Sequence, residues 1–226
     1  MSDEQGDERP SYEVRLHNAL ALEDFREAAR LAEKVLKCTK KPNIEKYRAI
    51  ADLWNKFFDQ ASEPTAADYR YGAIANDRAG YPLAAAQLWG EAIRRVPMSK
   101  VEKKHYKKAA VLWQKAIRSE GVKVPAAHYL RAAMVCKNAG YEKKANGYFS
   151  KGYMTQAWDR FEQGQYELAV SYGELSLQAS PRPSVNNKRA VEKFRFHVKE
   201  QNKFAQERPV LGVRRSTRLK GAIFKK

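Results

Sequence analysis

Cationic side chains are concentrated near the carboxyl end of this chain, in a form suited to binding phosphate. The six residues are Arg214, Arg215, Arg218, Lys220, Lys225 and Lys226. An arginine fork matches the oxygens of a phosphate bidentately, and each neutralised phosphate releases counterions. The segment therefore predicts sequence-independent anchoring to nucleic acid within a nucleoprotein. Docking on an acidic protein, a nuclear-import address and an inert tail remain open alternatives.

The same segment contains two hydroxyls that a kinase could modify. Arg214 and Arg215 stand three and two residues before Thr217, which is the arrangement that basophilic kinases favour. A phosphate on Thr217 or Ser216 would reduce the local positive charge. We therefore expect modification there to weaken polyanion binding.

A second group of lysines lies in the middle of the chain. It comprises Lys100, Lys103, Lys104, Lys107 and Lys108, opposed by Glu102. On a helix Lys104, Lys107 and Lys108 share one side. They are candidates for a second stripe that contacts phosphates, and a solvated lysine face is the alternative.

Net charge supports a polyanionic partner. The chain of 226 residues has a formal charge of +17, from 43 Lys and Arg against 26 Asp and Glu. Residues 184–226 hold 13 basic and 3 acidic side chains, which gives +10 of that total. Such a concentration argues against an evenly solubilised surface and favours nucleic acid, an acidic protein face or another polyanion.

Catalytic and metal-binding patterns are not found in the sequence. The four histidines, His17, His105, His128 and His197, are scattered, and the two cysteines, Cys38 and Cys136, are far apart. Neither set has the spacing of a zinc site or of a disulfide framework. We expect no enzyme activity, cofactor or small-molecule substrate, an intracellular reducing compartment (nucleus or cytoplasm), and no membrane partner, since no apolar run could span a bilayer.

Three segments repeat a pattern of glycine followed by small residues at matching offsets. Glycine permits the turn between two helices, and small residues let the second helix approach its neighbour closely. The pattern predicts stacked helical hairpins, with helices of 10 to 16 residues and no strand. The marks are Gly80, Ala85, Trp89, Ala92 and Pro97; Gly140, Ala145, Phe149 and Gly152; and Gly164, Ala169, Gly173, Ser176 and Pro181.

The sequence also makes three local predictions about where helices begin and end. Two helices over 12–37 are broken near residues 22–24, where Glu23 stands in place of the turn glycine. Ser99 with Glu102 forms a capping box that opens a helix at residue 100. Residues 142–151 and 153–163 form separate helices.

The marks from Gly80 to Pro97 resemble the tetratricopeptide repeat, and the two later sets match it in part. The resemblance covers about residues 65–181. The glycines are 60 and 24 residues apart instead of about 34, and Gly173 replaces an aromatic residue. The resemblance implies a right-handed superhelix whose groove binds a peptide or whose faces dock proteins. An unrelated helical array or bundle with small residues at its crossings is the alternative.

One use of this family, clamping the C-terminal carboxylate of a chaperone, depends on asparagines in the first helix of a hairpin. Six residues before each glycine this chain has Ile74, Met134 and Trp158, and nine before it Tyr71, Arg131 and Thr155. The clamp is not visible, so the sequence disfavours a chaperone adaptor.

The sequence therefore predicts an all-α, irregular tetratricopeptide-like array that acts as a structural scaffold. The array docks on protein, and the basic tail anchors it to nucleic acid or another polyanion in a larger assembly. A soluble peptide-binding adaptor with a targeting tail is the alternative. The predicted regions are an acidic arm over 1–11, the array over 12–183, a basic helix over 184–207 and an extended basic tail over 208–226.

Overall fold

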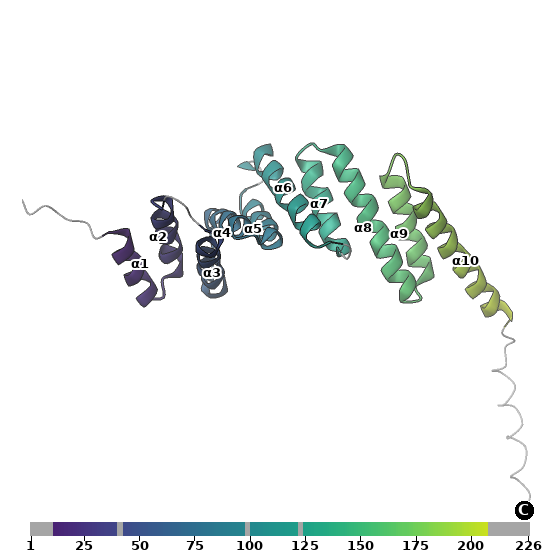
Figure 1. Ribbon diagram of the computed structural model, residues 1–226. Helices are drawn as coiled ribbons and strands as arrows, with labels where there is room; N and C mark the ends of the chain where they lie inside the picture. The colour runs from purple at the N-terminus through teal and green to yellow at the C-terminus, as the bar shows by residue number, and fades with distance from the viewer. Residues whose placement is uncertain (1–10, 40–42, 98–99, 122–123, 208–226) are drawn as a thin grey trace, which may run out of the picture. The chain divides into compact units, whose positions relative to one another are not determined.

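The computed structural model describes residues 11–39, 43–97, 100–121 and 124–207, and the ten labelled elements within them are all α-helices (Figure 1). Successive helices from α1 to α7 pack on one another, and so do α9 and α10, so the fold is an all-α, tetratricopeptide-like array. The helices are α1 (Tyr12–Ala21), α2 (Phe25–Lys37), α3 (Ile44–Gln60), α4 (Ala66–Arg78), α5 (Pro82–Arg94), α6 (Lys103–Ser119), α7 (Ala126–Asn138), α8 (Glu142–Glu162), α9 (Tyr166–Ala179) and α10 (Val185–Glu207).

The glycines predicted to form hairpin turns have the required backbone conformation. Gly80, Gly140 and Gly164 have φ values of +83°, +79° and +73°, in the left-handed region that residues with a Cβ disfavour. They separate α4 from α5, α7 from α8, and α8 from α9. The sequence prediction of these three turns is confirmed.

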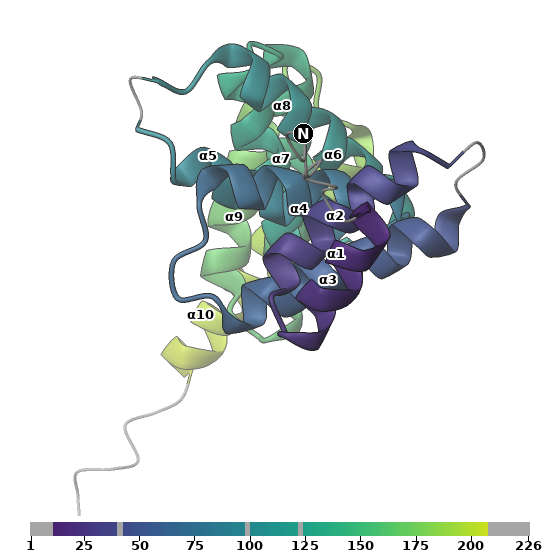
Figure 2. The ribbon, with the colours of Figure 1, turned by 90° about the vertical axis from the view of Figure 1, so that its left-hand side faces the viewer.

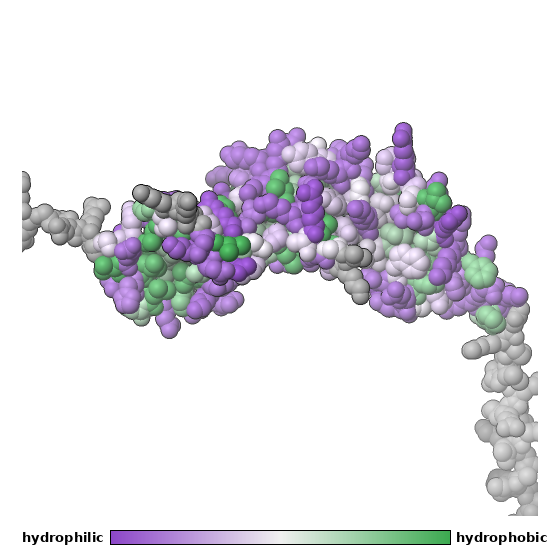
Figure 3. All heavy atoms as spheres, in the orientation of Figure 1, coloured by the Kyte–Doolittle hydropathy of each residue, from purple (hydrophilic) through white to green (hydrophobic). Residues whose placement is uncertain are grey.

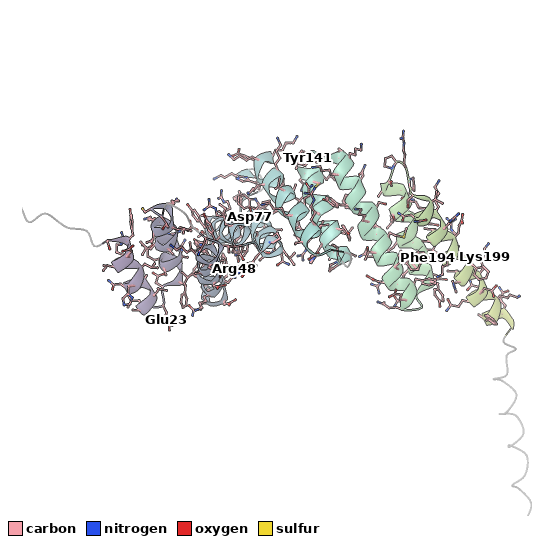
Figure 4. All side chains as sticks on the ribbon, in the orientation of Figure 1. Glu23, Arg48, Asp77, Tyr141, Phe194 and Lys199 are labelled. Carbon is pink, nitrogen blue, oxygen red and sulfur yellow. The ribbon has the colours of Figure 1, made fainter. Side chains whose placement is uncertain are left out.

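Glu23 occupies the equivalent turn between α1 and α2, where the sequence has no glycine (Figure 4). Its φ is +55°, and its backbone N–H donates to the carbonyl of Leu20 at 3.2 Å. The predicted break at 22–24 is therefore confirmed, with a glutamate in the strained position.

Replacing Glu23 with glycine is expected to stabilise the fold by about 0.5–1 kcal/mol. Relief of the left-handed strain, about 1–2 kcal/mol, exceeds the extra chain entropy that glycine loses. Urea denaturation measures the difference. Ala21→Gly, two residues earlier at the end of α1, is the control and should destabilise the protein. If Glu23→Gly is no more stable than the natural protein, Glu23 is not strained.

The chain divides into two compact units, residues 1–148 and 149–226. In the first unit α1, α2 and α3 lie side by side (Figure 2), and small side chains let the helices approach closely. Its buried core residues are Ala19, Ala28 and Leu31 on α1 and α2; Ala29, Leu36, Ile50, Ala51, Trp54, Ala75 and Ala79 around α3; and Ala73, Ala85, Ala86, Trp89, Ala109, Leu112, Trp113, Ala116 and Ala132 on α4 to α7.

A buried carboxylate connects α2 to the start of α4. Asp68, which is 1% exposed, accepts hydrogen bonds from Arg26 Nε and Nη2, both at 2.8 Å, and from Arg30 at 3.2 Å. It also accepts from the hydroxyl of Thr65 at 2.7 Å, as part of the capping box that begins α4. This network fixes two helices that are separated by α3 in the sequence.

The second unit is built on the carboxyl part of α8, with α9 and α10. Phe194 of α10 is fully buried, and its ring lies 5.0 Å from the rings of both Trp158 and Phe161. Gly173 lets α10 approach α9, since a Cβ there would lie 2.7 Å from Val191 Cγ2. The glycine that departs from the family pattern therefore has a packing role.

Two local predictions are wrong. α8 is one helix of 21 residues that continues through Gly152, because a glycine weakens a helix by only about 1 kcal/mol and Gly152 is buried. α6 begins at Lys103, capped by Glu102 and His105 instead of Ser99, which lies outside the described residues. The predicted limits of arm, array, basic helix and tail remain predictions.

Candidate functional site

A groove of about 860 Å³ lies on the first unit. Its walls come from the end of α3, the length of α5 and one face of α7, with Trp113 of α6 at its base. It is open to solvent along its length. The lining residues are Asn55, Phe58, Asp59, Ala84, Ala86, Gln87, Leu88, Gly90, Glu91, Arg94, Trp113, Leu130, Arg131, Met134 and Val135.

The sequence of α5 explains why this helix lines the groove. Ala85, Trp89 and Ala92 recur at three and four residues and are buried against α4 and α6. The opposite side, with Gln87, is left for the groove. Because Ala85, Trp89 and Ala92 are buried against α4 and α6, the opposite side of α5 is the one that faces the groove.

The floor of the groove is apolar and its margins are charged. Leu88, Leu130 and Val135 are half-buried, whereas Met134 is 53% exposed and can pack on a bound side chain. Glu91 and Arg94 form an ion pair on α5. Arg131 is exposed and has no ion-pair partner among the described residues. The groove thus suits a protein segment with apolar side chains in its centre and a carboxylate beside Arg131.

Two of these residues stand at positions considered for the family's clamp. Met134 and Arg131 precede Gly140 by six and nine residues, on the first helix of the α7–α8 hairpin. The structure places both in the groove, although neither is an asparagine. Sequence reasoning identified these positions but not the groove itself, because its walls come from three helices far apart in the chain.

Gly90 gives a direct test of how open the groove is. It lies inside α5, and a Cβ added there would meet nothing within 4 Å. Gly90→Ala should stabilise the protein by up to about 1 kcal/mol, because alanine is the better helix former. Thermal denaturation measures this. Gly72→Ala is the comparison: its Cβ would lie 2.5 Å from Phe58 Cε2, so that variant should be less stable than the natural protein. Equal effects of the two would be inconsistent with this packing.

Most other predicted packing residues are buried at helix contacts. Ala145 and Ala169 are 1% and 0% exposed, and Phe149 is half-buried. Ser176 is fully buried, and its hydroxyl donates to the carbonyl of Ser150 at 2.8 Å. Small residues thus join α8 to α9 in the second unit.

Two of the three lysines in the predicted stripe form ion pairs within the protein. Lys104 Nζ lies 2.8 Å from Glu102, and Lys108 Nζ lies 3.7 Å from Asp77, which also pairs with Lys115 at 2.6 Å (Figure 4). Lys107 is exposed. The six cationic residues of the tail, with Ser216 and Thr217, lie outside the described residues.

His128 and Cys136 have structural surroundings that account for them. His128 lies 2.8 Å from Glu120, and its ring packs on Trp113. Burial raises the pKa of the Cys136 thiol, which opposes thiolate formation. Within the described ranges, no three His, Cys, Asp or Glu side chains gather as a metal site requires, and no helix is long and apolar enough to cross a membrane.

Comparisons with known proteins add little to this description. No protein-family model and no curated protein matches the chain. Two crystal structures of MamA are 17% and 18% identical to it, cover 74% and 73% of this chain and 89% and 93% of their own, and have TM-scores of 0.30 and 0.28. The C-terminal part of a TPR repeat-containing protein from Cytophaga hutchinsonii is 14% identical, covers 86% of this chain and 89% of its own, and has a TM-score of 0.24. These similarities are too low to transfer a function, and the tetratricopeptide-like assignment is based on the hairpins themselves.

Proposed function

We propose that this protein is a non-enzymatic scaffold that holds a protein partner in the groove of α3, α5 and α7 and anchors to nucleic acid through its basic tail. The groove carries the proposal, because an apolar floor with charged margins is typical of a surface that binds a protein segment. Helical-hairpin arrays offer such extended surfaces as a consequence of their stacking.

The basic tail supports the second half of the proposal. Residues 208–226 hold Arg208 with the six cationic residues already named and no acidic residue, so the segment can neutralise several phosphates. The assembly we propose is a ribonucleoprotein or another nucleoprotein particle, in an intracellular reducing compartment. The rival function is a peptide-binding adaptor whose tail is a targeting signal.

Capture from native lysate separates the two functions. The full chain and a form lacking residues 208–226 are each used as bait, with and without nuclease. The proposal expects nuclease to release the nucleic acid and tail removal to lower the amount captured, while a protein bound in the groove is retained in both cases. If the full chain captures no nucleic acid at physiological salt, the anchoring function is wrong and the adaptor is favoured.

A further inference from the structure

Four lysines from three helices gather at one end of the first unit, around the turn between α7 and α8. We call this group the lysine end: Lys103 in the first turn of α6, Lys137 in the last turn of α7, and Lys143 and Lys144 in the first turn of α8. All four side chains are exposed. Figure 3 shows mainly hydrophilic residues over this end of the unit.

The contact that joins α6 to this turn is specific. A Cβ built on Gly140 would lie 2.7 Å from Lys103 Nζ and 2.8 Å from its Cε, so the ammonium of Lys103 rests against the turn. Lys144 extends over the ring of the neighbouring Tyr141, with Nζ 5.3 Å from the ring centroid. Tyr141, labelled in Figure 4, marks the turn. The bare glycine thus lets the ammonium of Lys103 lie against the turn that precedes α8, whose first turn holds Lys143 and Lys144.

Little nearby negative charge offsets this group. Glu102 is engaged by Lys104, and none of the four lysines forms an ion pair with a described carboxylate. Glu142 remains as an exposed carboxylate in the first turn of α8. Both α6 and α8 begin at this end and α7 ends there, so two amino termini and one carboxyl terminus leave a net partial positive charge. By contrast, Lys108 and Lys115 share Asp77 further along α6.

The composition of the lysine end indicates the class of partner. Protein interfaces are depleted of lysine at their centre and need apolar or aromatic anchors, whereas the phosphate backbone of nucleic acid is bound by spaced point charges. Here Tyr141, 36% exposed, is the large side chain at the turn, with lysines around it. Insertion into a lipid surface needs an apolar face, which this end does not present.

We propose that the lysine end is a second nucleic-acid contact that binds the phosphate backbone independently of the tail. The inference deepens the proposed anchoring function and rests on it for the class of partner. Its residues differ from the predicted stripe of Lys104, Lys107 and Lys108, two of which are held in ion pairs.

The test measures binding of the full chain to a fluorescein-labelled 20-base-pair DNA duplex by anisotropy over a range of salt concentrations. The variant is K103Q/K143Q/K144Q. The matched control is K37Q/K46Q/K56Q, which removes the same charge from exposed positions on α2 and α3. Circular dichroism establishes that both are folded. The slope of log Kd against log salt should fall by about 2 to 3 in the variant and by less than about 0.5 in the control.

Three outcomes would decide between the alternatives. Equal slopes for variant and control would overturn the proposal. Displacement of the duplex by poly-L-glutamate as effective as by unlabelled duplex, at equal charge, would overturn it in favour of an acidic protein. A form lacking 208–226 should keep the lysine-dependent part of the slope; if removing the tail changes nothing, the tail anchor fails while the lysine end stands.

Discussion

Replacing Phe194 with alanine is expected to destabilise the second unit by about 3–5 kcal/mol. The ring is fully buried and packs against Trp158 and Phe161, and the unit has few other large buried side chains to close the cavity. Hydrogen exchange of the amides of α9 and α10 should accelerate by about 100-fold or more, because their protection depends on this core.

Phe196 provides the control on the same helix. Its side chain is 59% exposed, so Phe196→Ala should change stability by no more than about 0.5 kcal/mol. Similar exchange rates in the two variants would contradict the burial of Phe194 of α10 against α8 and α9.

Replacing Asp68 with alanine is expected to cost about 2–3 kcal/mol in the first unit. The change removes the acceptor for Arg26, Arg30 and Thr65 together. Both arginine side chains are more than one-third exposed and can regain water, which limits the cost. Urea denaturation measures the loss, and Asp59→Ala on the exposed end of α3 is the control. A loss no greater than that of the control would show that the network adds no stability.

The same network predicts a dependence on pH. Burial alone raises the pKa of Asp68, but hydrogen bonds from Thr65 and Arg26 outweigh it and hold the pKa below the ordinary 3.8. Because the folded-state pKa is lowered, the contribution is complete above pH 3.8 and is lost as the pH falls through the folded value. Stability of the natural protein should therefore fall more steeply than that of Asp68→Asn below this pH. Parallel curves would remove Asp68 as the cause.

Local patterns predicted most of the hairpins. Gly80, Gly140 and Gly164 identified turns because a left-handed backbone leaves a recognisable residue type. Glu23 adopts the same conformation without that residue, so the predicted break at 22–24 did not depend on a glycine. The prediction that a helix ends at Gly152 was wrong, because a buried glycine can remain within a helix.

The groove and the lysine end could not be predicted in this way. Arg131 and Met134 were noted for their position, but their neighbours in the groove are 37 to 79 residues earlier on α3 and α5, or on α6. Lys103 was counted within a lysine run, yet its contact is the turn at Gly140. Both surfaces depend on how different helices pack together, and the hydrophobic periodicity of one helix does not show which other helix lies beside it.

Filling the groove tests the central claim most directly. Gly90→Tyr places a ring in the groove, and Gly147→Tyr places the same ring at another helix position with open space, on α8 outside the groove lining. With both full-length variants folded, quantitative capture of proteins from nuclease-treated lysate is compared with the natural chain. A specific protein retained by the natural chain and by Gly147→Tyr should be lost with Gly90→Tyr. Retention of the same proteins at the same levels by all three would contradict it.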